Sequence, residues 1–224
     1  KCAYCGISAS GHQSSAIASR DLISKEAGSK KNTFIRVKWP VYRLEDVLES
    51  IKLRQANFKR VCISMITHKN AVKDTAHITD KIRSASRLPI SILITPTLIK
   101  SPEVLMQFKS CGAEMIGVAV DAATRDIFEK YRGRGVKGPH NWDKYWQVLK
   151  WSVEIFGRYM AGIHLIAGLG ETEKQAVETI SRAHAIGAKT HLFSFCPEPR
   201  SLLEDIKPPL LISYRKIQIA RYLI

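Results

Sequence analysis

The chain of 224 residues is 45% hydrophobic, which suffices for one domain with a buried core, and we expect residues 1–224 to form that single domain. No apolar run approaches the ~20 residues that a transmembrane helix requires, so we expect no membrane span. The net charge of +15 would attract anionic partners, but the basic residues are dispersed and no nucleic-acid recognition motif is evident, which makes nucleic acid an unfavoured partner.

Secondary structure is predicted to alternate between helices and short buried strands. Helical periodicity of the apolar residues predicts helices over 44–55, 74–85, from 101 onward, 141–156, 172–186 and 208–224. Short apolar runs predict strands over 60–66, 90–94, 115–120, 160–167 and 189–195. Thr172 and Gln175 have the spacing of a capping box, which predicts the start of one helix.

This alternation is typical of parallel strands joined by crossover helices, and it predicts an α/β fold. Together with one strand expected upstream of Cys2, the pattern gives about six units, a partial (β/α)6 version of the TIM barrel. A doubly wound open sheet is the competing architecture, but no Gly-x-Gly-x-x-Gly turn follows the first strand signals. In both architectures ligands bind at the carboxyl ends of the strands.

The cysteine count and the chain ends give further expectations. Five cysteines, an odd number in a chain of ordinary composition, argue against a secreted disulfide scaffold and favour a reducing cytoplasm. The chain starts at Lys1 with no initiator Met and no apolar signal segment. We expect a cytoplasmic domain whose N-terminal end lies upstream of Lys1, and the last helix stops abruptly at Ile224, as it would if a C-terminal part were also missing.

The pair Cys2 and Cys5 is the sharpest chemical feature of the sequence. By itself a Cys-x-x-Cys pair is compatible with half of a zinc site, a redox pair or two core thiols. A zinc site needs a second pair nearby, and the next cysteine is Cys62. The pair alone therefore leaves the zinc or redox module open as an alternative to an enzyme.

The run Cys2-Ala3-Tyr4-Cys5-Gly6 resembles the last two thirds of the Cys-x-x-x-Cys-x-x-Cys loop of radical S-adenosylmethionine (radical SAM) enzymes. The resemblance implies a first cysteine upstream of Lys1 and a 4Fe-4S cluster held by Cys2 and Cys5, the catalytic metal ligands. Three thiolates leave one iron open, and in this family S-adenosylmethionine binds that iron and is cleaved to a 5'-deoxyadenosyl radical. Tyr4 is implied to pack near the adenine, with a plain core aromatic as the alternative.

Residues 164–172 resemble the Gly-x-Ile-x-Gly-x-x-Glu segment on the fifth strand of these enzymes, and their sequence is closest to that of biotin synthase. The resemblance implies that Ile166 contacts the adenine and that Gly168 lets the backbone turn tightly. His164 replaces the usual leading glycine. It is either a core histidine or a polar group near the substrate.

Two charged features complete the expected cofactor site. Asp121 ends an apolar strand at the expected mouth of the barrel, and the resemblance implies that it binds the ribose hydroxyls; the alternative is a helix cap. Arg132 and Arg134 lie in a Gly-rich basic loop, and either could grip the methionine carboxylate through its guanidinium fork. The alternative for both arginines is a solvated loop.

Residues 60–67 resemble the second strand of biotin synthase, where a cysteine matching Cys62 helps to hold an auxiliary cluster. The resemblance implies a possible second iron-sulfur cluster at Cys62, although Ile92 and Gly162 stand where further cysteine ligands are expected. The alternative, which involves no cluster, is that Cys62 and Cys196 are buried thiols. Backbone around Ser64 and Met65 is implied to meet the amino group of the cofactor.

The resemblance covers nearly the whole chain and implies a radical SAM enzyme of the biotin synthase and lipoyl synthase type, closest to the biotin synthase-related components of archaeal-type lipoyl synthases. The implied reaction is sulfur insertion into an octanoyl-lysyl carrier protein, a sulfurtransferase activity in lipoate biosynthesis. The implied partners are ferredoxin or flavodoxin as electron donor, an acidic acyl-carrier or lipoyl domain protein, and a companion radical SAM subunit. Biotin synthase, methylornithine synthase-like and hydrogenase-maturation enzymes are alternatives that share every motif.

Overall fold

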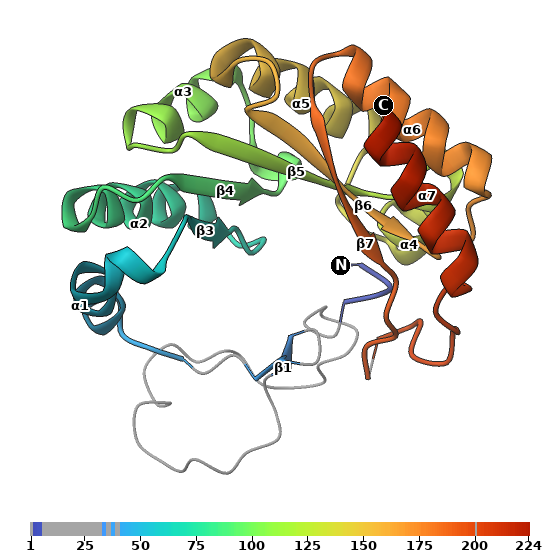
Figure 1. The fold of residues 1–224 in the computed structure, drawn as a ribbon, viewed down its shortest axis with the longest axis horizontal. Helices are drawn as coiled ribbons and strands as arrows, with labels where there is room; N and C mark the ends of the chain where they lie inside the picture. Colours follow the sequence, from blue (N-terminus) through green and yellow to red (C-terminus); the bar gives the residue numbers. More distant parts are fainter. Residues whose placement is uncertain (1, 6–32, 35–36, 39–40, 200) are drawn as a thin grey trace.

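The computed structural model describes residues 2–5, 33–34, 37–38, 41–199 and 201–224, so Gly6 of the cysteine motif lies outside the described residues. Most of the described chain is one curved layer of strands covered on one side by helices (Figure 1). A separate antiparallel pair is formed by β1 (Thr33–Phe34) and β2 (Val37–Lys38).

The main sheet has five parallel strands in the order β3-β4-β5-β6-β7. Their bounds are Val61–Ser64 for β3, Ile90–Ile94 for β4, Met115–Asp121 for β5, Ala161–Ala167 for β6 and Lys189–Ser194 for β7. Each strand pairs with its neighbour in sequence, as it does in a barrel, whereas a doubly wound sheet reverses its strand order. All five strands fall within one or two residues of their predicted ends.

Most of the helices lie on the convex side of the sheet, along the outside of the arc in Figure 1. The α-helices are α1 (Leu44–Arg54), α2 (Ala71–Ala85), α3 (Pro102–Ser110), α4 (Arg125–Tyr131), α5 (Trp142–Phe156), α6 (Glu173–Ala185) and α7 (Leu211–Leu223). Short 3-10 turns are η1 (Gln55–Asn57), η2 (Pro96–Leu98) and η3 (Arg134–Val136). Within the described ranges, no helix is long and apolar enough to cross a membrane.

The predicted α/β class and partial barrel are confirmed. The described strands form an arc whose edge strands, β3 and β7, do not pair with each other, so the sheet is not closed. Five of the six predicted strands are observed in the described residues, and the sixth was expected upstream of Cys2.

The predicted helix starts are confirmed in most places. Thr172 and Gln175 form the predicted capping box, in which each side chain accepts a hydrogen bond from the other residue's backbone N–H. The final helix begins at Leu211, three residues later than predicted. The short helix α4 was not predicted at all; Thr124 caps it by accepting a hydrogen bond from the N–H of Ile127.

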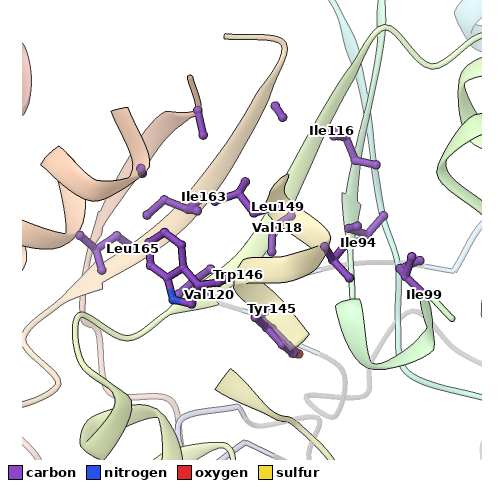
Figure 2. Close-up of a cluster of buried hydrophobic side chains, with 14 of the residues drawn as sticks. Ile94, Ile99, Ile116, Val118, Val120, Tyr145, Trp146, Leu149, Ile163 and Leu165 are labelled. Carbon is purple, nitrogen blue, oxygen red and sulfur yellow. The ribbon is translucent and has the colours of Figure 1, made fainter. Parts of the chain in front are cut away.

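Alternation along the strands separates a helix-facing side from a concave side. In β4, Ile90, Ile92 and Ile94 are at most 1% exposed, whereas Ser91 and Leu93 are half-buried. Ile92 and Ile94 pack beneath the helices in the main core, part of which Figure 2 shows, and Ile90 packs in a smaller cluster with Ile82 and Leu88. Burying one such side chain contributes about 1.5–3 kcal/mol. The core thus fixes which strand residues face the concave side, where a ligand can approach.

Candidate functional site

The segment Cys2 to Cys5 lies at the carboxyl ends of the strands. Its backbone makes two 2.7 Å hydrogen bonds: the N–H of Ala3 donates to the carbonyl of Tyr131, and the carbonyl of Ala3 accepts from the N–H of Leu202. Tyr131 ends the helix that follows β5, and Leu202 lies beyond β7. These bonds fix the cysteine segment at the mouth of the arc.

A small apolar cluster packs around Ala3 of the same segment. Ala3 is 2% exposed and clusters with Leu169 and Phe195, which follow β6 and β7, and with Leu203. Tyr4 and Ile166 are partly buried against this cluster. The two residues that sequence resemblance assigns to adenine contact therefore share one apolar surface at the mouth.

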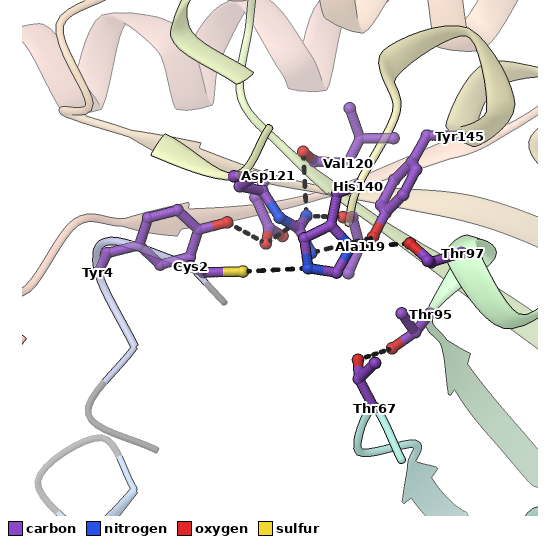
Figure 3. Close-up of polar contacts among 11 residues, drawn as sticks. Cys2, Tyr4, Thr67, Thr95, Thr97, Ala119, Val120, Asp121, His140 and Tyr145 are labelled. Carbon is purple, nitrogen blue, oxygen red and sulfur yellow. Dashed lines mark hydrogen bonds and ion pairs between the residues drawn. The ribbon is translucent and has the colours of Figure 1, made fainter. Parts of the chain in front are cut away.

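Tyr4 and Asp121 form the first polar contact between the cysteine segment and the sheet. The Tyr4 hydroxyl donates to Asp121 Oδ2 at 2.7 Å (Figure 3). Burial raises the pKa of Tyr4 well above its usual value, and the Asp121 carboxylate adds to this effect. Asp121 has φ of 63°, a left-handed conformation that aspartate tolerates better than most residues, at a register shift where β5 pairs with β6. This irregularity places the Asp121 carboxylate at the mouth.

Arg132 is the buried counter-ion of Asp121. Its Nη1 lies 2.9 Å from Asp121 Oδ2, and the Asp121 and Arg132 side chains are 12% and 6% exposed. Nη1 also donates to the carbonyls of Ala119 and Val120, and Nη2 donates to the Tyr145 hydroxyl at 3.3 Å. The Asp121 helix-cap alternative is not what the structure shows, because Thr124 caps α4.

His140 connects this group of side chains to Cys2. Its Nε2 lies 3.7 Å from Cys2 Sγ, and its Nδ1 lies 2.8 Å from both the Thr97 and the Tyr145 hydroxyl oxygens (Figure 3). Burial lowers the pKa of His140 to about 3, and the nearby Arg132 charge adds to this. The three contacts orient the ring with Nε2 toward Cys2 and Nδ1 toward the two hydroxyls.

These hydrogen bonds and the ion pair form one continuous series of contacts that starts and ends in the cysteine segment. It runs from Cys2 through His140, Tyr145, Arg132 and Asp121 back to Tyr4. We call these six residues the mouth network. Of these, Cys2, Tyr4, Asp121 and Arg132 are predicted site residues, whereas His140, Tyr145 and the adjoining Thr97 were not predicted. No local signal distinguishes them, because their importance lies in contacts between distant segments.

The concave face of β6 and β7 carries a second group of polar side chains. His164 pairs in register with His191, and Ile166 with Phe193. The His164 ring centroid lies 5.5 Å from that of His191 and 4.9 Å from that of Phe193. Burial lowers the pKa of His164 to about 4. His164 is thus a neutral imidazole on the concave face, where it can exchange hydrogen bonds with a ligand.

Small residues open the concave face in front of these rings. A Cβ at Gly117 would lie 3.5 Å from His164 Nε2, and a Cβ at Gly162 would lie 3.3 Å from His191 Cδ2. Gly162, where the resemblance leads one to expect a cysteine, has no room for a side chain, because its Cβ would also lie 2.8 Å from the carbonyl oxygen of Lys189.

Gly168 occupies the turn after β6 with φ of +107°. A Cβ there would lie 2.6 Å from Pro209 Cδ, so the turn requires glycine on both conformational and steric grounds. Glu171 closes the same turn: its Oε1 accepts from the N–H of Gly168 at 2.6 Å and its Oε2 from the N–H of Leu169 at 3.0 Å.

Cys62, Ser64 and Met65 lie on or next to edge strand β3, on the opposite side of the arc from β7. Cys62 and Ser64 are exposed, whereas Met65 packs partly against the main core. The interpretation of Cys62 as a buried thiol is wrong, because alternation in β3 turns its side chain away from the helices. Ile92 cannot mark a ligand position beside Cys62, since Ile92 faces the helices and the register partner of Cys62 is Ser91.

The remaining expected site residues differ in their surroundings. The Arg134 side chain is 90% exposed and pairs with Glu129 at 3.3 Å. Cys196 is half-buried just beyond β7, and none of the five cysteines forms a disulfide. In the part of the chain that the structure describes, no three His, Cys, Asp or Glu side chains gather as a metal site.

Comparison with known proteins identifies one family. Residues 1–183 match the family described as the Radical SAM superfamily. A solved structure with similarity to this chain is that of the radical S-adenosylmethionine methyltransferase TsrM from Kitasatospora setae with cobalamin and a 4Fe-4S cluster bound, at a TM-score of 0.48 and 14% identity. The similarity covers 72% of this chain and 33% of that one, so the chain spans about a third of that enzyme. No curated protein matches the sequence.

Proposed function

Because the chain belongs to the radical SAM superfamily, whose members use a 4Fe-4S cluster and S-adenosylmethionine, we propose that its active site is the mouth of the arc, with Cys2 and Cys5 as cluster ligands. The observation that carries this proposal is the mouth network. It connects Tyr4 to Asp121 at the end of β5, and it connects Cys2 to His140 in the loop before α5. The cysteine segment is thereby held where barrels bind their ligands.

The residues present fit an iron-sulfur cluster. Cys2 and Cys5 project from a single turn, closed by a 3.3 Å hydrogen bond from the N–H of Cys5 to the carbonyl of Cys2. Both cysteines are half-buried at the mouth, and thiolates are the ligands that such clusters require. When bound, the cluster supplies the electron that cleaves S-adenosylmethionine into methionine and a 5'-deoxyadenosyl radical. An external reductant such as ferredoxin or flavodoxin would provide that electron.

The protein's own residues would bind and orient the cofactor. Tyr4 and Ile166 offer an apolar surface for the adenine, beside the tight turn at Gly168. Asp121 lies at the mouth with a carboxylate suited to ribose hydroxyls. Ser64 and Met65, at the end of β3, are the proposed contact for the amino group of methionine.

The two arginines receive different proposed roles. Arg132 is buried and already bonds Asp121 and two carbonyls, so we assign it to positioning Asp121 rather than to gripping the cofactor. Arg134 is exposed, and it is the candidate for the methionine carboxylate if it leaves Glu129.

For the substrate, we propose sulfur insertion of the lipoyl synthase type into an octanoyl-lysyl carrier protein. Support comes from the biotin synthase-like sequence of residues 164–172. The net charge of +15 also favours binding of an acidic carrier domain. Cys62 supplies an exposed thiol on the concave face, the place where a second cluster would be sought. His164 and His191 form the polar part of the proposed substrate wall.

The test is anaerobic reconstitution of the full-length protein with iron and sulfide, followed by incubation with S-adenosylmethionine, reductant and an octanoylated carrier peptide. We expect stoichiometric iron and acid-labile sulfide, 5'-deoxyadenosine and a thiolated peptide. Formation of 5'-deoxyadenosine without a thiolated peptide would exclude sulfur insertion but would support radical SAM chemistry. Bound zinc in place of iron would exclude both sulfur insertion and radical SAM chemistry.

A further inference from the structure

We propose that His140 donates a hydrogen bond from Nε2 to Cys2 Sγ and thereby raises the reduction potential of the cluster that Cys2 holds. This inference rests on the proposed function, since it requires Cys2 to be a cluster ligand. It assigns a role to a residue that no motif in the sequence marks.

The direction of the hydrogen bond follows from the partners of the imidazole. An imidazole nitrogen can donate a hydrogen bond to a thiolate only when that nitrogen carries a proton. Nδ1 lies 2.8 Å from the hydroxyl oxygens of Thr97 and Tyr145, both of which can donate. The Tyr145 oxygen already accepts from Arg132 Nη2 at 3.3 Å, which directs the Tyr145 proton toward Nδ1.

The proton of His140 therefore lies on Nε2, which faces Cys2. The Nε2 to Sγ distance of 3.7 Å is suited to a hydrogen bond with sulfur. A thiolate that ligates iron has no proton to donate, so the other tautomer would set two lone pairs against each other. The Nε2–H tautomer gives each ring nitrogen a hydrogen-bond partner: Nε2 donates to Sγ and Nδ1 accepts from a hydroxyl.

His140 is also held firmly enough for this bond to persist. It is 6% exposed, and its ring stands edge-on to that of Tyr145 at 5.8 Å between centroids. Thr97 follows β4 and Tyr145 lies in α5, so two separate elements orient the ring. Because His140 is buried, little water competes for its Nε2–H, which strengthens the bond.

A hydrogen bond to a cluster thiolate changes the redox equilibrium. Reduction adds one negative charge to the cluster and its ligands, and an N–H that points at a ligand sulfur stabilises the more negative state. Removing the donor is therefore expected to make the cluster harder to reduce. The readout is the midpoint potential itself, which is independent of turnover.

The experiment is a redox titration of the anaerobically reconstituted full-length protein, followed by electron paramagnetic resonance. We expect His140→Leu to shift the midpoint potential to a more negative value and His140→Gln, which keeps an N–H donor, to shift it less. The matched control is His184→Leu, an exposed histidine in α6 whose contact is with Tyr159, and its potential should equal that of the wild type.

A second variant tests the tautomer without removing the imidazole. Thr97→Val combined with Tyr145→Phe deletes both hydroxyls at Nδ1, and it too should lower the potential, since Nε2 is no longer forced to carry the proton. If His140→Leu assembles a normal cluster with an unchanged midpoint potential, the inference is wrong and the proposed function stands. If His140→Leu does not fold, an unchanged midpoint potential in the double variant has the same meaning. A wild-type protein that assembles no iron-sulfur cluster overturns the proposed function as well.

Discussion

The hydroxyl of Tyr4 and the carboxylate of Asp121 are 2.7 Å apart although 117 positions separate the two residues in the chain. This hydrogen bond joins the cysteine segment to the end of a central strand. It involves an ionised acceptor in a buried place, where such bonds are strongest. The stability of the mouth should therefore respond to changes at either residue.

Tyr4→Phe is expected to lower the free energy of unfolding by about 1.5–3 kcal/mol, the usual contribution of a hydrogen bond to a charged group. Urea denaturation measures the change. Tyr159→Phe, which removes the exposed contacts with Arg158 at 3.4 Å and His184 at 3.3 Å, is the matched control and should cost well under that amount. Equal losses in the two variants would argue that the Tyr4 bond is not formed in solution.

Arg132→Met is expected to destabilise the protein by about 3–5 kcal/mol, because it leaves the Asp121 carboxylate buried without its counter-ion. The double variant Arg132→Met with Asp121→Asn removes both charges and should recover part of that loss. A thermodynamic cycle of the two single variants and the double variant yields the coupling energy. A coupling near zero would contradict the buried ion pair.

Gly168→Ala is expected to destabilise the turn after β6 for two reasons, a φ of +107° and a Cβ placed 2.6 Å from Pro209 Cδ. Gly170→Ala is its control in the same turn, since Gly170 has φ of +111° but a Cβ there would meet nothing within 4 Å. Backbone strain alone costs about 1–3 kcal/mol. Calorimetry should therefore show a larger loss for Gly168→Ala, and equal losses would exclude the steric contribution.

Lowering the pH is expected to destabilise the protein through His164. Burial lowers its pKa to about 4 in the folded protein, against an unfolded value of 6.5. Between pH 6.5 and 4 the unfolded chain binds a proton that the folded one does not, so stability falls as the pH falls, by at most about 1.4 kcal/mol per pH unit for one group. His164→Gln should make the measured slope shallower in this window and leave the slope near pH ~8 unchanged. An identical slope in both proteins would show that His164 is solvated.

The sequence predicted most of the fold because its strands and helices carry strong periodic patterns. The run Ile90–Ile94 is a strand with the predicted ends, and its alternating burial follows from the pleat of the sheet. Helix α4 was missed because it has only seven residues and lies between a strand and a Gly-rich loop. Propensity is weak over so short a stretch.

The candidate site was predictable where a residue belongs to a motif and not where its role depends on a distant partner. Asp121 was found because it ends an apolar strand, but its pairing with Arg132 depends on how α4 returns to the sheet. His140 lies 138 positions from Cys2, and nothing in its neighbourhood distinguishes it from a loop histidine. Such partners emerge only from tertiary packing.

The carboxylate of Glu171 also limits what the turn after β6 can recognise. Backbone amides in glycine turns often serve as anion receptors, yet those of Gly168 and Leu169 already have Glu171 as an internal anion. A phosphate would meet a negative charge here. With both amides bonded and a carboxylate beside them, this turn disfavours a phosphate group as a partner.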